Sequence, residues 1–139
     1  MYVTAIVPAH NEAGNIKRAV RALKKQVDKV IVVCDRCDDD TYQRAQQAGA
    51  RAFETVQNEG RKAGALNQAL ENYVDWQRPD QYLFICDADT VITEDWIEHA
   101  KRVIAQGDYD AVGSVFYGTA NRNKLIEFCQ QLEWYRYAN

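Results

Sequence analysis

The sequence has no apolar run that approaches the roughly 20 residues needed to cross a bilayer. Its first residues, Met1 to Pro8, lack the basic region that opens a secretory signal and have the pattern of a strand. We therefore expect a cytoplasmic protein, or one at the inner face of a membrane if it belongs to a longer chain. Linkers, internal repeats and low-complexity stretches are also missing, which predicts a single domain over residues 1–139.

An excess of charge of one sign is lacking too. The 17 basic and 20 acidic residues leave a formal net charge of -3, so there is no electrostatic case for binding to nucleic acid or to an anionic membrane. Five basic residues cluster, but at helical spacing, which favours a solvated helix face: Lys17, Arg18, Arg21, Lys24 and Lys25. The 47% hydrophobic content is ordinary for a soluble globular protein.

Cysteine is scarce, with four residues in the chain. Cys34 and Cys37 have the spacing of a metal-binding or redox pair, but neither a second cysteine pair nor a nearby histidine completes a zinc site. A thioredoxin-type motif opens a helix after the first strand of its βαβ unit, whereas this pair follows the second apparent strand. We predict structural roles for both, as small side chains at a strand end.

Short apolar runs alternate with helical stripes along the chain. Strands are predicted over residues 3–8, 29–33, 50–56, 82–86 and 111–117. Helical stripes lie at 16–27, 39–48, 66–74, 96–104 and 125–132, with Thr93 as the expected N-cap of the fourth. This alternation predicts an α/β fold, a Rossmann-like three-layer sandwich around a mostly parallel sheet.

Polar loops follow the first four of these strands, at residues 8–12, 35–40, 58–64 and 87–89. In open α/β sheets, ligands bind beyond the carboxyl ends of the strands. We therefore expect all four loops to open on one edge of the sheet and to form the functional site there.

The segment Asp87-Ala88-Asp89 is the sharpest local signal. Two carboxylates directly after a buried strand have few protein partners, and a hard cation such as Mg²⁺ or Mn²⁺ would neutralise them. The alternative is a plain turn in which Asp87 caps its own backbone.

The loop that follows the third predicted strand is glycine-rich and basic. Gly60 and Gly64 permit a tight turn, and Arg61 and Lys62 between them suit a diphosphate at a helix N-terminus. The alternative is a helix start with surface charge. The spacing does not match the P-loop of ATPases.

Asp35 can accept a hydrogen bond from the imino N–H of uracil, or it can cap the next helix. His10 can be a ligand, a proton carrier or a loop hydrogen-bonding residue.

Together these loops resemble the family 2 glycosyltransferases of GT-A fold. The opening strand and loop at 6–12, the cysteine-containing second motif at 32–41, the Lys-Ala-Gly-x-Leu-Asn-like segment at 60–67 and the Asp-x-Asp motif at 87–89 occur in the family's order. The second motif has Cys34 where many members carry another aspartate. The likeness covers nearly the whole chain and implies the nucleotide-sugar-binding portion of such an enzyme.

The resemblance implies roles for several residues. Glu12 and Asp35 should contact the nucleoside, and the backbone of Pro8, Ala9 and His10 should lie beside it.

At the other end of the site, Lys62 should reach the diphosphate or the base, and Asp87 should contact the nucleotide-sugar. Asp89 should hold the Mn²⁺ or Mg²⁺ that bridges the phosphates. The donor is expected to be a UDP-sugar.

The implied reaction is inverting transfer of a sugar to a hydroxyl of a saccharide or lipid-linked acceptor. The family's catalytic base has no counterpart here, since Glu127 and Glu133 do not match its motif. We therefore expect a chain truncated on its C-terminal side that binds donor but transfers little sugar. Apolar residues near the end predict self-association: Leu125, Phe128, Leu132, Trp134 and Tyr135.

Two other functions remain open. A sugar nucleotidyltransferase is also α/β and metal-dependent, although its Gly-rich, Arg-containing first loop is missing here. A truncated, inactive nucleotide-binding or assembly module would show the same motifs. A response-regulator receiver fits poorly, because its acidic pair should follow the first strand.

Overall fold

The computed structural model describes residues 1–107 and 109–114. The chain divides into two compact units, residues 1–102 and 103–139. The first unit contains the complete described sheet, and in the second the described residues are 103–107 and 109–114. A single domain over the whole chain stays a prediction.

The sheet has four strands: β1 (Tyr2–Ala9), β2 (Lys29–Cys34), β3 (Arg51–Glu54) and β4 (Gln81–Ile85). Their order is β3-β2-β1-β4, and every neighbouring pair is parallel. The central strands carry continuous apolar runs, as expected when both faces of a parallel sheet are covered. The predicted α/β fold with a parallel sheet is confirmed.

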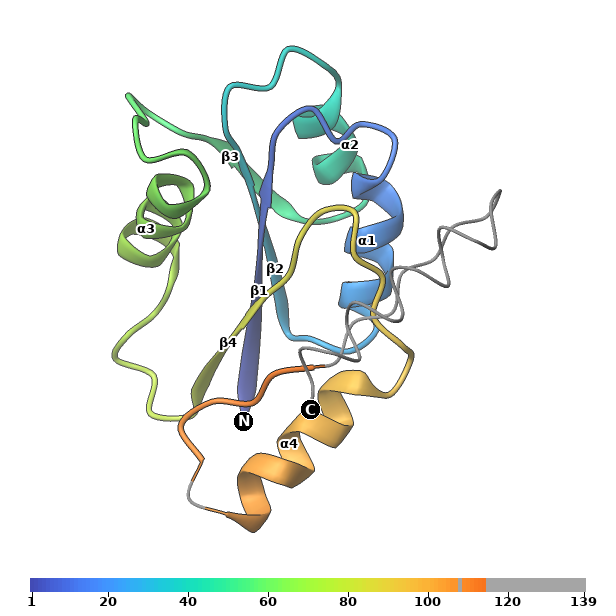
Figure 1. Cartoon of the computed structure of the whole chain (residues 1–139), viewed down its shortest axis with the longest axis vertical. Coiled ribbons are helices and arrows are strands. Elements are labelled where there is room, and N and C mark those ends of the chain that lie inside the picture. The colour runs from blue at the N-terminus through green and yellow to red at the C-terminus, as the bar shows by residue number, and fades with distance from the viewer. Residues whose placement is uncertain (108, 115–139) are drawn as a thin grey trace, which may run out of the picture. The chain divides into compact units, whose positions relative to one another are not determined.

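Four helices accompany the strands: α1 (Ile16–Lys24), α2 (Thr41–Gln47), α3 (Arg61–Tyr73) and α4 (Trp96–Gln106). Figure 1 shows α1 and α2 on one face of the sheet and α3 on the other, so the first unit is a three-layer sandwich. Each β-α-β step returns the chain to a parallel strand, which brings the carboxyl ends of the strands to the same edge.

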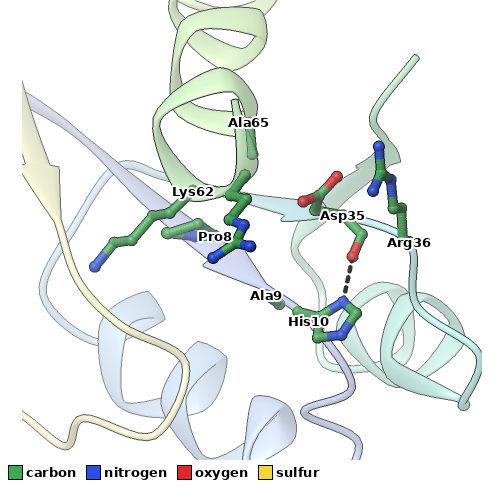
Figure 2. A pocket seen from close by; sticks show the side chains of 8 residues that line it. Pro8, Ala9, His10, Asp35, Arg36, Lys62 and Ala65 are labelled. Atoms are coloured by element: carbon green, nitrogen blue, oxygen red, sulfur yellow. Dashed lines mark hydrogen bonds between the residues drawn. The ribbon is translucent and has the colours of Figure 1, made fainter. Parts of the chain in front are cut away.

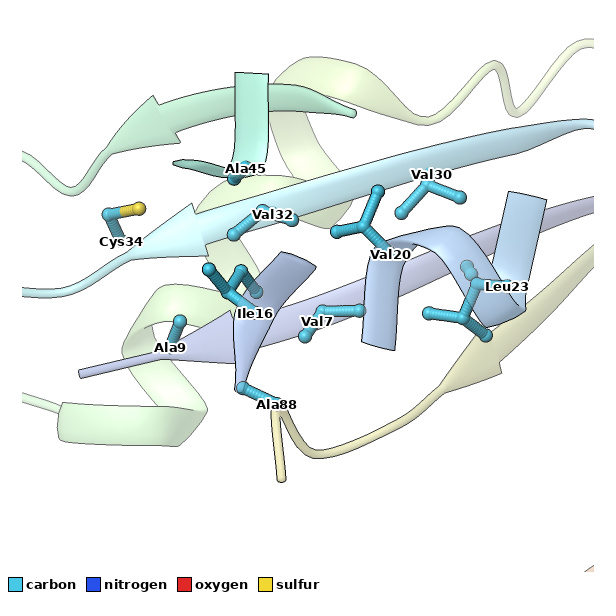
Figure 3. Close-up of a cluster of buried hydrophobic side chains, with 11 residues drawn as sticks. Val7, Ala9, Ile16, Val20, Leu23, Val30, Val32, Cys34, Ala45 and Ala88 are labelled. Atoms are coloured by element: carbon cyan, nitrogen blue, oxygen red, sulfur yellow. The ribbon is translucent and has the colours of Figure 1, made fainter. Parts of the chain in front are cut away.

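On the α1 side of the sheet, the core forms where one face of α1 packs against alternate residues of the strands. Ile16, Val20 and Leu23 of α1 are at most 1% exposed. They pack with the side chains of β1 and β2 that face this helix, such as Val7 and Val32 (Figure 3). Fully burying one such aliphatic side chain stabilises a fold by about 1.5–3 kcal/mol. This packing fixes α1 and therefore the end of the loop that follows β1.

The opposite face of the sheet packs against α3. Ala65 and Ala69 are fully buried on Ile6, Ile31 and Val33, and their small size lets the helix lie close to the sheet. At its far end, the Lys29 ammonium donates to the Tyr73 carbonyl at 2.7 Å and satisfies one of the last carbonyls of the helix. The first turn of α3 is thereby held at the carboxyl edge of the sheet.

The start of α4 differs from the prediction. The helix begins at Trp96 rather than just after Thr93, because a residue distant in sequence caps it. The Gln26 side chain accepts from the Ile97 N–H at 3.2 Å and donates to the Thr93 carbonyl at 2.8 Å. Thr93 thus contributes its carbonyl to this end of the helix, and its predicted role as N-cap is wrong.

Two predicted elements are not seen in the described part of the chain. Residues 111–114 of the predicted fifth strand form no strand, and residues 115–117 lie outside the described residues. The last helical stripe, residues 125–132, with Glu127, Glu133 and the apolar patch predicted to self-associate, also lies outside them. In the part of the chain that is described, no helix is long and apolar enough to span a membrane.

Candidate functional site

A cavity of about 500 Å³ opens at the carboxyl edge of the sheet. Its walls come from the ends of β1 and β2 and from the first turns of α3, and its lining residues are Pro8, Ala9, His10, Asp35, Arg36, Arg61, Lys62 and Ala65. Five of these were site residues on sequence grounds. Arg61 was expected only as part of a basic glycine loop, and Arg36 and Ala65 were not expected, because only the fold shows which neighbours of a motif face the cavity.

Asp35 is the acidic residue among those that line the cavity. Its backbone N–H donates to the Ala9 carbonyl at 2.9 Å, and its carboxylate accepts from the Thr55 hydroxyl at 2.7 Å. Partial burial alone would raise the pKa of Asp35, but the hydrogen bonds of Thr55 and Asn58 and the charge of Arg36 outweigh it. The pKa therefore lies below the ordinary 3.8, and the side chain is a carboxylate at neutral pH.

His10 is tied to the same residue through the backbone. Its Nδ1 lies 2.6 Å from the Asp35 carbonyl oxygen, as the dashed line in Figure 2 marks. A carbonyl oxygen only accepts, so Nδ1 must carry the proton, and in a neutral ring Nε2 is left as an acceptor. His10 therefore has a loop hydrogen-bonding role, and its second ring nitrogen has no partner in the part of the chain that the structure describes.

Glu12 does not line the cavity. Its carboxylate accepts from the Asn15 amide at 2.9 Å, and its backbone N–H donates to the Thr41 hydroxyl at 2.8 Å. Thr41, fully buried, is in turn held by Asp39, whose carboxylate also accepts from the Ala13 N–H. In this structure Glu12 holds the start of α1, and its contact with a nucleoside stays a prediction.

The two cysteines connect these loops. Cys34 is fully buried at the end of β2, and this burial, with the neighbouring Cys37, raises the pKa of its thiol to about 12. The Cys37 sulfur accepts from the Asn11 N–H at 3.4 Å and donates to the Ala9 carbonyl at 3.5 Å. Both thiols are free, and Cys37 ties the loop after β1 to the loop after β2.

The loop before α3 is organised by a buried asparagine. The Asn58 side chain donates to the Arg61 carbonyl at 2.8 Å and accepts from the Gly60 N–H at 3.0 Å. The backbone carbonyl of Asn58 accepts from the Arg36 guanidinium. The side chain lies against Gly64, where an added Cβ would come within 1.9 Å of Asn58 Oδ1. Glycine is thus required at position 64 because the Asn58 side chain lies so close to its backbone. From the sequence, Asn58 was only part of a polar loop, and this contact was not predicted.

Two cations stand side by side where α3 begins. Arg61 and Lys62 both line the cavity, at a helix end whose first N–H groups have no intrahelical acceptor. Lys62 extends away from Asp35 (Figure 2), and its ammonium forms an ion pair with the Asp87 carboxylate. The cavity therefore has a carboxylate at one end and positive charge at the other.

The segment Asp87-Ala88-Asp89 places its carboxylates outward because Ala88 points inward. Ala88 is 4% exposed and joins the core beneath α1, whereas both aspartates are exposed. The turn is closed by the backbone, since Thr90 N–H donates to the Asp87 carbonyl at 3.1 Å. The Asp87 carboxylate pairs with Lys62 instead of capping its own backbone, and Asp89 forms no hydrogen bond or ion pair with the described residues.

These two carboxylates are the candidate ligands for a divalent cation. Burial raises the pKa of the neighbouring Cys86 thiol to about 11, and the negative charges of Asp87 and Asp89 add to this effect. Among residues 1–107 and 109–114, no group of three or more acidic, histidine or cysteine side chains is arranged to hold a metal. The donor set suits Mg²⁺ or Mn²⁺ that takes its other ligands from phosphate oxygens and water.

Comparison with known proteins identifies the family. The family model described as Glycosyl transferase family 2 matches residues 4–139. The chain belongs to this family. The motifs that line the cavity and flank it all lie within the match.

Relatives of this glycosyl transferase family 2 chain agree with the fold. An uncharacterized glycosyltransferase of Rickettsia felis is 43% identical over 51 residues, which cover 37% of this chain and 18% of the relative. Crystal structures of glucosyl-3-phosphoglycerate synthase from Mycobacterium tuberculosis, with Mn²⁺, UDP and phosphoglyceric acid or with Mg²⁺ and UDP, each superpose with a TM-score of 0.63 at 21% identity. Each covers 77% of this chain and 40% of the synthase chain.

At such low identity these structures establish the fold alone. The four-stranded parallel sheet of this chain matches GT-A structures over about 40% of their length. The chain therefore spans well under half of the length of the proteins that it resembles.

Proposed function

We propose that this cavity binds the nucleotide part of a UDP-sugar, with Mn²⁺ or Mg²⁺, as the donor site for inverting sugar transfer to a hydroxyl acceptor. The observation that carries the proposal is the polarity of this cavity: the hydrogen-bonded Asp35 carboxylate is at one end, and Arg61 and Lys62 are at the other, where Lys62 is ion-paired with Asp87 outside the lining. A nucleoside diphosphate has the complementary polarity.

At the first end, Asp35 is suited to a uracil ring. A carboxylate accepts the N3–H of uracil, whereas N3 of cytosine is itself an acceptor and would face it unfavourably. The low pKa of Asp35 keeps this acceptor ionised at neutral pH. Pro8 and Ala9 line the cavity beside Asp35, and His10 Nε2, which has no partner among the described residues, can bond a ribose hydroxyl.

At the second end, Lys62 and the first N–H groups of α3 are suited to the diphosphate. Lys62 must leave Asp87 to reach a phosphate, which frees the Asp87 carboxylate for the sugar or the cation. Asp89 has no protein partner to give up among the described residues. When bound, the cation neutralises charge that develops on the leaving diphosphate.

Family membership favours sugar transfer over the sugar nucleotidyltransferase reaction. A saccharide or a lipid-linked molecule is the proposed acceptor. The synthase structures that share the fold contain UDP with Mn²⁺ or Mg²⁺, which supports this donor and these cations. A binding or assembly module without transfer activity would use the same pocket, so binding and turnover need separate tests.

The test is calorimetric titration of the 139-residue chain with UDP in Mn²⁺ and again in chelator. We expect binding that is at least about tenfold tighter with the cation, because without it the negative charges of Asp87 and Asp89 would repel the diphosphate. CDP is the matched control, and it should bind more weakly than UDP if Asp35 reads the base. Equal affinity with and without cation would remove the metal from the proposal, and no binding of UDP in either condition would refute it.

Release of UDP from a UDP-sugar, measured with and without saccharide acceptors, then separates transfer from binding alone. Pyrophosphate release from UTP and a sugar 1-phosphate would instead indicate the nucleotidyltransferase reaction. Either result identifies the reaction without changing the binding assay.

A further inference from the structure

We propose that Arg61 is the phosphate ligand that is ready before the donor arrives, and that it gives the pocket its preference for a nucleoside diphosphate over a nucleoside. The inference rests on the proposed function, since it assigns a residue to the diphosphate end of the same cavity. The sequence paired Arg61 with Lys62 as a cation suited to a diphosphate and gave Arg61 no separate role, whereas the structure distinguishes the two by their partners.

Three cationic side chains, Arg36, Arg61 and Lys62, line the cavity, and two of them already have protein partners. Lys62 is ion-paired with Asp87. The Arg36 guanidinium donates to the Asn58 carbonyl, a contact that helps hold the loop before α3. The Arg61 guanidinium has no hydrogen bond or ion pair with any residue that the structure describes.

This difference decides which cation binds a phosphate at least cost. Lys62 gains a phosphate only by giving up a carboxylate, and Arg36 only by loosening the loop. Arg61 exchanges nothing but water, so its interaction is gained in full. A guanidinium also presents two parallel N–H groups to phosphate oxygens, which an ammonium cannot do.

The backbone of Arg61 is held in place although its side chain is not. Asn58 Nδ2 donates to the Arg61 carbonyl at 2.8 Å, and the residue has a φ of 49°, which few side chains adopt without support. The buried Asn58 thereby aims the first residue of α3 at the cavity. Lys62, the next residue, reaches toward Asp87, so the two cations flank the space between the base end and the acidic pair.

The experiment compares UDP and uridine binding, in Mn²⁺, for the 139-residue chain and three variants. Arg61→Met removes the charge at similar length, Arg61→Lys keeps a charge without the planar fork, and Arg18→Met removes an arginine from the exposed face of α1. We expect Arg61→Met to weaken UDP binding by about tenfold or more while uridine binding is unchanged. Arg61→Lys should recover part of the loss, and Arg18→Met should have no effect.

Different failures have different meanings. Normal UDP binding by Arg61→Met, in a chain that binds UDP, would overturn the role of Arg61 and leave the proposed function standing. Equal weakening of UDP and uridine would show that Arg61 supports the loop instead of the phosphate, and equal weakening by Arg18→Met would show only a general effect of charge. If the unmodified chain binds no UDP, the proposed function and this inference fail together.

Discussion

Gly64 lies in the first turn of α3, where the helix touches the side chain that organises the loop before it. Glycine in a helix is normally a weakness, so Gly64→Ala would ordinarily stabilise the chain by about 1 kcal/mol. Here we expect the opposite sign. A methyl group at this position would lie 1.9 Å from Asn58 Oδ1 and 3.0 Å from Asn58 Cγ, far inside contact distance.

The magnitude follows from what Asn58 would lose. The side chain is 5% exposed and makes hydrogen bonds to the Arg61 carbonyl and from the Gly60 N–H. Two such bonds are worth about 1 kcal/mol each, and a buried group left unpaired costs about 1–3 kcal/mol. After the gain in helix propensity, Gly64→Ala should lower the free energy of unfolding by about 1–3 kcal/mol.

The assay is a double-mutant cycle followed by thermal or urea unfolding. In an Asn58→Ala background the obstructing atoms are gone, so the same Gly64→Ala change should become stabilising by about 1 kcal/mol. Gly14→Ala is the matched control, because a Cβ there meets nothing within 4 Å. It should be neutral or slightly stabilising.

A change of sign between the two backgrounds is therefore the expected signature. Stabilisation by Gly64→Ala in the unmodified chain, or the same effect in both backgrounds, would refute the account of Asn58 as the residue that holds this loop. Weaker UDP binding by Gly64→Ala should accompany the loss of stability, because Arg61 and Lys62 depend on the same loop.

Two predictions concern the carboxylates. Asp89→Asn should abolish the effect of Mn²⁺ on UDP affinity and leave the ligand-free melting temperature unchanged or slightly raised, because Asp89 is exposed and close to another negative charge; a large fall in melting temperature would instead mark it as structural. The depressed pKa of Asp35 means that its ionised form stabilises the fold above the ordinary value of 3.8 and that this contribution is lost as the pH falls further. Asp35→Asn should therefore lose less stability than the unmodified chain in melts below about pH 4, and identical pH profiles would contradict the shift.

The alternation of elements was predictable because it is written in local periodicity. The apolar run from Val30 to Val33 and the stripe of Ile16, Val20 and Leu23 determine a strand and a helix before any long-range contact forms. That Asp35 and Lys62 share one cavity also followed from the sequence. Parallel strands place the loops at their carboxyl ends together, whatever the side chains do.

Other features depended on contacts between distant residues. α4 begins at Trp96 because Gln26 caps it, and Glu12 turns toward Asn15 and Thr41 instead of the cavity. Neither the capping by Gln26 nor the orientation of Glu12 can be recognised from a periodic pattern in the sequence.

Sequence alone therefore determined the α/β class, the family resemblance and which loops follow the strands at one edge of the sheet, since those rest on patterns of a few residues repeated along the chain. Tertiary structure alone decided which partner each charged side chain of the site has. Lys62 pairs with Asp87 across 25 residues of sequence, Arg36 is held by Asn58, and Arg61 is left facing the cavity. Such pairings depend on where side chains meet after folding, and motif spacing carries no information about them.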